Sequence, residues 1–373
     1  MKEYKVGIIG VGFVGIAHIE ALRRLGNVKV VAICGRHNIK EKAENLTIKH
    51  AFTDYKDMID KMDLDFIHIC TPNNTHFEMA KYALENDINV VLEKPMTITS
   101  EEAKILTDLA NEKKLINVIN FQNRLYPTSI QMKHMISEGE IGDVISIHGQ
   151  YLQDWLLYDT DYSWRLNSKE SGNTRAVADL GSHWMDLIEF LTNLKITEVF
   201  AEFKTHYPKR KKPMGPTESF TVSHTGDYQT YDVDTEDIAM MLFRFSNNAV
   251  GSVTISQMAA GNKNNLQVNI LGTKSSIQWT LEDLENIRLG NRDSANQTIA
   301  KDYLLTNLAK DFIDYPAGHM EGYPDSIKHV FKEVYQSQSK NYQYHATFKD
   351  GLRQMILCEK IYESARSHKW ISI

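Results

Sequence analysis

The sequence predicts an α/β protein with two domains: a parallel sheet with crossover helices, then an α+β domain built on a large, open, mostly antiparallel sheet. Three observations support this prediction. The chain has 373 residues, which is long enough for two domains. Apolar runs alternate with helical segments up to about residue 122, whereas strand-like runs follow one another after it. We therefore expect domains at 1–122 and 123–373.

The first domain opens with a strand, a glycine turn and a helix. Residues 5–9 form an apolar run, and residues 16–25 carry apolar side chains at helical spacing. Between them, Gly10, Gly12 and Gly15 make a Gly-x-Gly-x-x-Gly turn. The first glycine permits a tight turn, the second admits a pyrophosphate to the backbone, and the third lets the helix pack closely. The helix N-terminus then faces the phosphate charge, so we expect a Rossmann dinucleotide-binding domain.

The end of the second strand leaves the choice of dinucleotide open. An NAD-preferring site places a carboxylate about 20 residues after the glycines, to hold the ribose 2′-hydroxyl. This chain has Gly35 there, followed by Arg36. Arg36 can pair with a 2′-phosphate, which favours NADP. It can equally stack on the adenine or face water, so both NAD and NADP remain open.

The carboxyl ends of the other parallel strands are expected to line the cofactor crevice. Strands are predicted at 66–70, 89–92 and 116–119, with helices filling the gaps between them. A polar segment follows each strand. These segments are Thr71-Pro72-Asn73, Glu93-Lys94-Pro95 and Asn120-Phe121-Gln122.

The second domain is predicted to contain a mostly antiparallel sheet with helices on one face. A hairpin turn is expected at residues 246–248, and closing helices at about 324–337 and 347–367. The other face of such a sheet needs a cover, and a second copy of the chain is a common one. The predicted strands are 144–152, 198–206, 238–245, 249–257, 266–271 and 276–280.

Two charged runs in this domain do not suggest a further site. Residues 209–212 are basic and lie between prolines, and we interpret them as a solvated loop rather than a polyanion site. Residues 227–237 are acidic but lack the order of a calcium loop, so we interpret them as a surface connection.

Composition excludes several classes of function. The net charge is −6, which gives no basic field for nucleic acid or an anionic membrane. The three cysteines are far apart and form no Cys-x-x-Cys, which argues against a disulfide framework and a zinc site. No apolar run approaches the length of a membrane span, and the N-terminus lacks the layout of a signal peptide. We expect a cytoplasmic protein.

Three residues are candidates for catalysis of hydride transfer on a carbinol. Asp179 and His183 stand at the start of an amphipathic helix. A histidine has a pKa near neutrality and can take the proton of an alcohol, while a carboxylate fixes its tautomer. Lys94 is positioned to stabilise a developing alkoxide beside the nicotinamide. His183 is otherwise a structural histidine. Asp179, His183 and Asp186 also resemble metal ligands, but no nearby Cys or further His completes a set, so we expect no metal.

The motifs together resemble the glucose–fructose oxidoreductase and inositol dehydrogenase family over nearly the whole chain. They are the glycine turn, Thr71-Pro72-Asn73-x-x-His76, Glu93-Lys94-Pro95 and Asp179-x-Gly181-x-His183. The resemblance implies a dimer or tetramer formed through the open sheet, catalysis by Lys94, Asp179 and His183, and a cis bond before Pro95. The expected cofactor contacts are Gly10, Gly12, Phe13, Val14, Gly15, Gly35, Arg36, Thr71, Pro72, Asn73, His76, Glu93, Lys94, Gln122, Trp164 and Arg165.

Other segments resemble the levoglucosan dehydrogenase-like branch of that family, which oxidises the C3 hydroxyl of a pyranose-type ring. They include residues 151–157, 162–165, 234–237 and 318–325. Aromatic faces can stack on a neutral sugar ring, and polar side chains can hold its hydroxyls, although the aromatics are otherwise core residues. The expected substrate contacts are Tyr126, Gln153, Asp154, Trp155, Arg165, Asp179 and His183.

The leading hypothesis is therefore an NAD(P)-dependent dehydrogenase of a sugar or polyol. Two alternatives share the fold: a glycosidase that retains its nicotinamide and oxidises the sugar transiently, and a non-enzymatic regulator that binds the cofactor. The presence of Lys94, Asp179 and His183 argues against the regulator. The sequence does not identify the sugar or the direction of the reaction.

Overall fold

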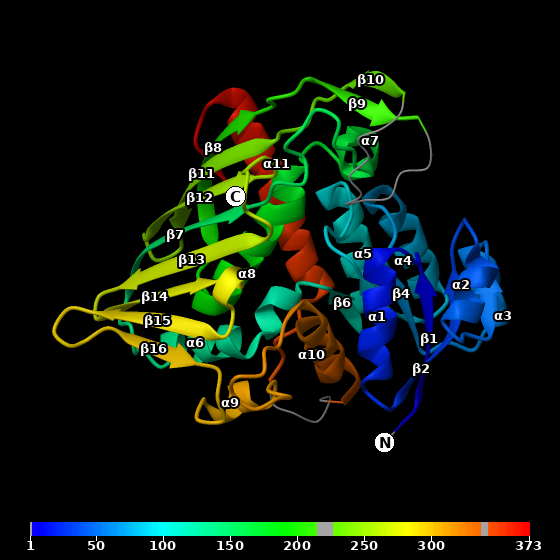
Figure 1. The fold of residues 1–373 in the computed structure, drawn as a ribbon, viewed down its shortest axis with the longest axis horizontal. Helices are drawn as coiled ribbons and strands as arrows, with labels where there is room; N and C mark the ends of the chain where they lie inside the picture. Colours follow the sequence, from blue (N-terminus) through cyan, green and yellow to red (C-terminus); the bar gives the residue numbers. More distant parts are fainter. Residues whose placement is uncertain (1, 215–226, 337–341) are drawn as a thin grey trace. The chain divides into compact units, whose positions relative to one another are not determined.

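The computed structural model describes residues 2–214, 227–336 and 342–373, which form two compact units (Figure 1). Unit 1 is Met1–Tyr126 with Glu321–Met355, and unit 2 is Pro127–Met320 with Ile356–Ile373. The sequence-based division at residue 122 placed all of the later chain in the second domain. Glu321–Met355 instead belongs to unit 1, because its apolar side chains complete that unit's core.

Unit 1 is built on a parallel sheet of six strands in the order β3-β2-β1-β4-β5-β6, which confirms the predicted Rossmann sheet. Its strands are β1 (Tyr4–Ile9), β2 (Val28–Cys34), β3 (His50–Phe52), β4 (Phe66–Ile69), β5 (Asn89–Leu92) and β6 (Asn117–Ile119). Its helices are α1 (Phe13–Arg23), α2 (Ile39–Asn45), α3 (Tyr55–Lys61), α4 (His76–Glu85), α5 (Ser100–Glu112) and α10 (Tyr323–Gln336). The first part of α11 (Phe348–Ser367) also belongs to it.

The central strands of unit 1 are mostly apolar because helices cover both faces of the sheet. All four residues of β4 are buried, including the polar His68. Helix α10 packs against α1, and its Phe331 ring lies 4.8 Å from His18 and 4.7 Å from His68 between ring centroids. These contacts fix α10 to the N-terminal sheet, although α10 lies about 300 residues after α1 in the sequence.

Unit 2 is built on a sheet of nine strands in the order β16-β15-β14-β13-β7-β12-β11-β8-β17, antiparallel except where β7 pairs with β12. Its strands are β7 (Val144–Leu152), β8 (Ile196–Lys204), β11 (Ile238–Phe245), β12 (Val250–Ser256), β13 (Asn265–Gly272), β14 (Ser275–Thr280), β15 (Asn286–Asn291), β16 (Gln297–Ala300) and β17 (Ile371–Ser372). The mostly antiparallel sheet and the hairpin between β11 and β12 are confirmed.

The helices of unit 2 are α6 (Pro127–Ser137), α7 (Ser168–Ser171), α8 (Ser182–Thr192), α9 (Asn307–Lys310) and the rest of α11. Helix α8 packs against β7 and β13, which buries one face of the sheet. A separate hairpin, β9 (Lys209–Pro213) with β10 (Tyr228–Asp232), was not predicted. In the described part of the chain, no helix has the length and apolar character to cross a membrane.

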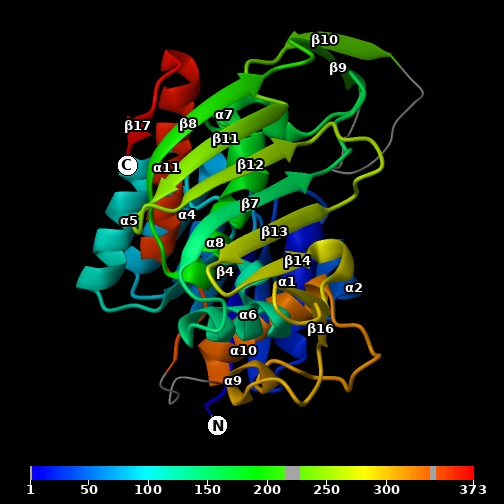
Figure 2. The same ribbon diagram turned by 90° about the vertical axis from the view of Figure 1, so that its left-hand side faces the viewer.

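The other face of the nine-stranded sheet carries exposed apolar side chains. Met240 pairs with Thr254 and Leu242 with Ser252 across β11 and β12, so their side chains share one face. Met240 is 58% exposed and Leu242 is 48% exposed. Figure 2 looks onto the strands with α8 behind them. This open face matches the arrangement expected from the sequence.

Candidate functional site

The glycine turn after β1 has the shape of a phosphate cradle. Gly10 has φ +90°, and a Cβ there would lie 2.6 Å from the Cys70 carbonyl oxygen. A Cβ on Gly15 would overlap the Gly10 carbonyl oxygen, whereas one on Gly12 would meet no atom within 4 Å. Two glycines are therefore required by packing, and Gly12 leaves the backbone open on the side a ligand approaches.

The residues that follow β4, β5 and β6 continue the sheet's hydrogen-bond ladder. The amides of Cys70, Glu93 and Asn120 donate to the last residue of a neighbouring strand at 2.8–3.0 Å. The predicted cofactor segments are thus aligned at one edge of the sheet, the edge where parallel α/β sheets bind ligands.

Glu93 is held at this edge by two hydrogen bonds. Its Oε1 accepts from His18 Nε2 at 2.9 Å and from Asn120 Nδ2 at 2.6 Å. Burial alone would raise the pKa of Glu93, but the hydrogen bonds from His18 and Asn120 and the charge of Lys94 lower it below its ordinary value. Lys94 follows on the same loop, and the predicted cis bond between Lys94 and Pro95 is confirmed.

His76 joins two of the predicted cofactor segments. Its ring nitrogens lie 2.9 Å from the Thr71 carbonyl oxygen and 3.0 Å from the Pro95 carbonyl oxygen, and the side chain is fully buried. Its polar atoms are therefore engaged by backbone, so it orders the cofactor-facing loops. Asn73 and Gln122 are also buried, whereas Thr71 and Pro72 are partly exposed.

The glycine turn is contacted by a charged residue that the sequence analysis missed. Lys42 on α2 donates through Nζ to the carbonyl oxygen of Val11 in the glycine turn at 2.9 Å. It places a positive charge beside the phosphate cradle, a role that its position in a surface helix did not signal. Arg36 and Phe13 are exposed, Val14 is partly exposed, and the amide of Gly35 donates to Phe52.

In unit 2, Asp179 and His183 stand where the sequence placed them, at the entry to α8. Asp179 lies in a π-helical turn, η4 (Val177–Gly181), and His183 in the first turn of α8. Asp179 Oδ2 accepts from Gln257 Nε2 at 3.0 Å, and its Oδ1 lies 3.5 Å from Arg165 Nε. Both side chains are buried, His183 being 5% exposed. Asp179 is thus an oriented carboxylate with a cation beside it.

Gln257 is a second residue that the sequence analysis missed. It follows β12. Its backbone N–H donates to the backbone carbonyl oxygen of Asp237, which fixes the main chain at this position. A polar residue directly after a buried strand was the available signal. Gln257 therefore orients the Asp179 carboxylate through a hydrogen bond that the sequence analysis did not anticipate.

The predicted substrate residues occupy different environments. Gln153 is buried and donates through Nε2 to Asn264 Oδ1 at 2.9 Å, an oxygen that also accepts from Tyr151 at 2.7 Å. Asp154 Oδ2 pairs with Lys263 Nζ at 2.7 Å, so it orders the loop after β12. Trp155 is partly exposed and donates to the backbone of the same loop.

Arg165 and Tyr126 complete the predicted set. The Arg165 guanidinium lies 4.5 Å from the ring centroid of Trp164, which holds it toward Asp179. Tyr126 is the last residue of unit 1 before α6 and is buried, and burial raises the pKa of its phenol to about 12. Its hydroxyl is therefore a neutral donor at physiological pH.

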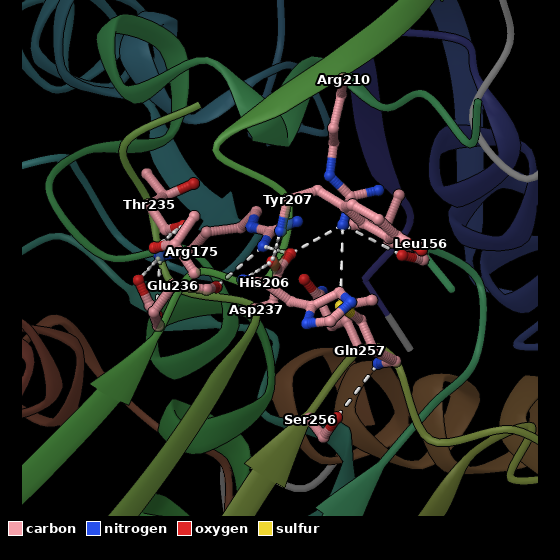
Figure 3. Close-up of polar contacts among 12 residues, drawn as sticks. Leu156, Arg175, His206, Tyr207, Arg210, Thr235, Glu236, Asp237, Ser256 and Gln257 are labelled. Carbon is pink, nitrogen blue, oxygen red and sulfur yellow. Dashed lines mark hydrogen bonds and ion pairs between the residues drawn. The ribbon is translucent and has the colours of Figure 1, made fainter. Parts of the chain in front are cut away.

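A buried charge cluster supports the turn that carries Asp179 (Figure 3). Glu236 accepts from the backbone amides of Arg175 at 2.9 Å and Val177 at 2.8 Å, immediately before Asp179. Asp237 Oδ1 accepts from Arg210 at 2.7 Å and from the guanidinium of Arg175. The cluster thus ties the η4 turn to the start of β11.

The structure corrects the interpretation of both charged runs. Residues 209–212 are not a solvated loop: they lie in β9, and strand alternation turns Arg210 inward to Asp237, where it is fully buried. The acidic run is not all surface, because Glu236 and Asp237 are 2% and 0% exposed. The two guanidiniums hold the pKa of Asp237 below its ordinary value against the opposing effect of burial.

Comparison with known families matches both units to one group of oxidoreductases. Residues 4–121 match the oxidoreductase family with an NAD-binding Rossmann fold. Residues 129–278 match the GFO/IDH/MocA C-terminal domain. The N-terminal unit is therefore an NAD-binding Rossmann domain. NAD is one of the two cofactors that the sequence left open.

Individual relatives align over almost the whole chain. A levoglucosan dehydrogenase of Pseudarthrobacter phenanthrenivorans is 28% identical over 100% of this chain and 99% of its own length. A glucose-6-phosphate 3-dehydrogenase of Bacillus subtilis is 21% identical over 99% of this chain and 98% of its own length. Among solved structures, a levoglucosan dehydrogenase in complex with NADH and L-sorbose superposes with a TM-score of 0.88 at 27% identity, covering 100% and 99% of the two chains.

Proposed function

Because the chain belongs to the GFO/IDH/MocA family of oxidoreductases, we propose that it transfers a hydride between a carbinol carbon of a sugar or polyol and a nicotinamide. The observation that carries this proposal is the buried pair Asp179 and His183 at the entry of α8, with Gln257 and Arg165 bound to the carboxylate. A domain that only sensed the cofactor would need neither an oriented carboxylate nor a histidine there.

The residues of unit 1 fit a dinucleotide. The open backbone at Gly12 and the N-terminus of α1 would hold the pyrophosphate, with the charge of Lys42 nearby. Glu93 and Lys94 would face the nicotinamide end, because they follow a central strand of the sheet. When bound, NAD supplies a hydride acceptor for the alcohol carbon.

In the proposed reaction, His183 accepts the hydroxyl proton of the substrate as the carbinol is oxidised. Asp179 stabilises the resulting imidazolium, since its carboxylate is held in a fixed orientation by Gln257. Lys94 stabilises the negative charge that develops on the substrate oxygen. In the reverse direction, the same groups return the proton to the alkoxide.

A pyranose or anhydrosugar oxidised at its C3 hydroxyl is the substrate class we propose. The support is the likeness to a levoglucosan dehydrogenase and the polar groups of unit 2 that suit hydroxyls. Gln153 has a buried carbonyl oxygen, Oε1, for which the described residues provide no donor. A neutral substrate hydroxyl is a suitable donor for such an oxygen.

The test is a titration with NAD and NADP separately, followed by a sugar panel with the cofactor that binds more tightly. The panel contains levoglucosan, L-sorbose, inositol and glucose-6-phosphate, and the signal is the absorbance of reduced nicotinamide. We expect NAD to bind and at least one sugar to be oxidised. Lys94→Ala and His183→Ala should each lower kcat by about 100- to 10,000-fold. The exposed residues Lys104 and His368 provide matched alanine controls.

Several outcomes would reject the proposal. Unchanged turnover in Lys94→Ala and His183→Ala would remove the mechanism, and absence of binding by either nucleotide would remove the function. Release of an aglycone without net accumulation of reduced cofactor would favour the glycosidase with transient oxidation.

We also propose that the chain forms a homodimer or homotetramer through the open face of the nine-stranded sheet. The support is the exposed apolar surface of Met240 and Leu242 on that face. A cytoplasmic location stays a prediction from the sequence.

A further inference from the structure

A chain of buried polar side chains in unit 1 leads to Glu93, and the proposed reaction does not use it. His18 Nδ1 lies 3.0 Å from His68 Nδ1, and His68 Nε2 lies 2.8 Å from the Tyr335 hydroxyl. The other ring nitrogen of His18 contacts Glu93 Oε1 at 2.9 Å. The two histidines are 0% exposed and Tyr335 is 2% exposed. Helices α1 and α10 and strand β4 therefore converge on one carboxylate.

The positions of the protons follow from the partners. Glu93 is anionic, because its pKa is lowered, so His18 Nε2 must carry a proton to donate to it. Burial lowers the pKa of His68 well below its ordinary value, so His68 is neutral and has a single N–H. This N–H points either at His18 or at Tyr335.

A proton on His68 Nδ1 satisfies every group. His68 then donates to His18 Nδ1, and the Tyr335 hydroxyl donates to His68 Nε2. A proton on His68 Nε2 instead requires His18 to be a buried cation, and it leaves the Tyr335 proton without an acceptor among the described residues. Such an arrangement costs more, because an unpaired buried donor loses its hydration.

Cys70 supports the same assignment from another direction. Its Sγ lies 3.4 Å from His18 Nδ1, and burial raises the pKa of the thiol well above its ordinary value. The thiol is therefore protonated and can donate weakly to the same nitrogen. This contact agrees with the assignment of Nδ1 as the acceptor.

We propose that Tyr335, His68 and His18 form a one-directional hydrogen-bond chain that holds Glu93 oriented for cofactor binding, with His18 as its positioning residue. Both His18 and Asn120 bind Oε1, so Oε2 is directed away from the chain. The side chain of Glu93 is 12% exposed, the one member of the chain that reaches the surface. The proposal rests on the proposed function only in its second half, the effect on cofactor affinity.

The first test is independent of activity. Long-range ¹H–¹⁵N NMR of histidine-labelled full-length protein reports which nitrogen of each ring is protonated. We expect an acceptor-type shift at His18 Nδ1 and His68 Nε2, and donor-type shifts at His18 Nε2 and His68 Nδ1. Tyr335→Phe should alter the shifts of both rings. Tyr4→Phe, a ring 5.2 Å from Tyr335, should alter neither tautomer. A donor-type shift at His18 Nδ1 would overturn the chain.

The second test is NAD affinity by fluorescence titration. His18→Leu removes both contacts and should weaken binding about tenfold, the effect of one lost hydrogen bond to a charged group. His18→Gln retains an acceptor and a donor and should recover most of the affinity. Equal affinity in wild type and His18→Leu would overturn the positioning role. If His18→Leu fails to fold, Tyr335→Phe takes its place with an expected loss of about threefold. If wild-type protein binds no nucleotide, the proposed function fails. The NMR measurement of the tautomers still tests the hydrogen-bond chain on its own.

Discussion

Replacing Asp237 by Asn should destabilise unit 2 far more than a single neutralised carboxylate usually does. Asp237 Oδ1 accepts from two guanidiniums, those of Arg175 and Arg210, and all three side chains are 0% exposed. Its Oδ2 accepts from the backbone amides of His206 and Tyr207. The substitution leaves two buried cations that share no anionic side-chain partner at this point.

The size of the effect follows from the burial. Removing one partner of a buried ion pair costs about 3–5 kcal/mol, because the remaining charge stays desolvated. Burial already lowers the pKa of Arg175, and Asp237 opposes that shift, so the guanidinium loses its main support. For a unit of roughly 200 residues, at roughly 2–4 °C per kcal/mol, the unfolding temperature should fall by about 6–20 °C.

The assay is thermal unfolding of the full chain followed by calorimetry, with Asp232→Asn as the control. Asp232 is 87% exposed and lies 3.9 Å from Lys209, so its loss should cost at most about 1 kcal/mol. The pKa of Asp237 is lower in the folded protein, so its stabilisation is full at neutral pH and is lost as the pH falls below 3.8. Equal unfolding temperatures for the two variants at neutral pH would refute this account of the cluster.

Three further predictions concern the cofactor turn, the candidate active site and the open sheet face. Gly12→Ala should fold normally, because the added Cβ meets no atom within 4 Å, but should weaken NAD binding roughly tenfold in a titration. Gln257→Leu should lower kcat about tenfold with little change in the NAD affinity, whereas the exposed Gln278→Leu should change neither. Leu242→Lys should shift the chain to a smaller species in analytical ultracentrifugation, whereas Leu304→Lys, at a residue 92% exposed, should not.

The long apolar runs made most of the fold predictable from the sequence. Strands β7 and β11 lie at the predicted residues, because each alternates or stays apolar over eight or more positions. Strand β3 was missed because its three residues carry no period, and β16 because its pairing with β15 involves mostly exposed side chains. The return of α10 to unit 1 was not predictable from periodicity, which indicates a buried face but not its partner.

The candidate site shows the same division between local and long-range information. Gly10, Gly12 and Gly15 were predictable because one turn contains all three. Gln257 and Lys42 were not, since each acts on a group 78 or 31 positions away along the chain. The burial of the Arg210 side chain was also not predictable. A run of four basic residues predicts exposed side chains, unless it is known that the run is a strand and that Asp237 is buried beside it.

Glu93 in unit 1 and Asp179 in unit 2 are stabilised in the same way. Each is a buried carboxylate whose neutral hydrogen-bond donors come from elsewhere in the chain: His18 and Asn120 for Glu93, and Gln257 for Asp179. Neutral donors stabilise an anion without cancelling its charge, so the carboxylate keeps a field that can act on a cationic partner such as an imidazolium. Asp237 differs, because the guanidiniums of Arg175 and Arg210 both contact its Oδ1 and compensate its charge. Asp179 also has Arg165 Nε 3.5 Å from its Oδ1, so the difference lies in degree: neutral donors orient Asp179 and Glu93, whereas two guanidiniums bind Asp237.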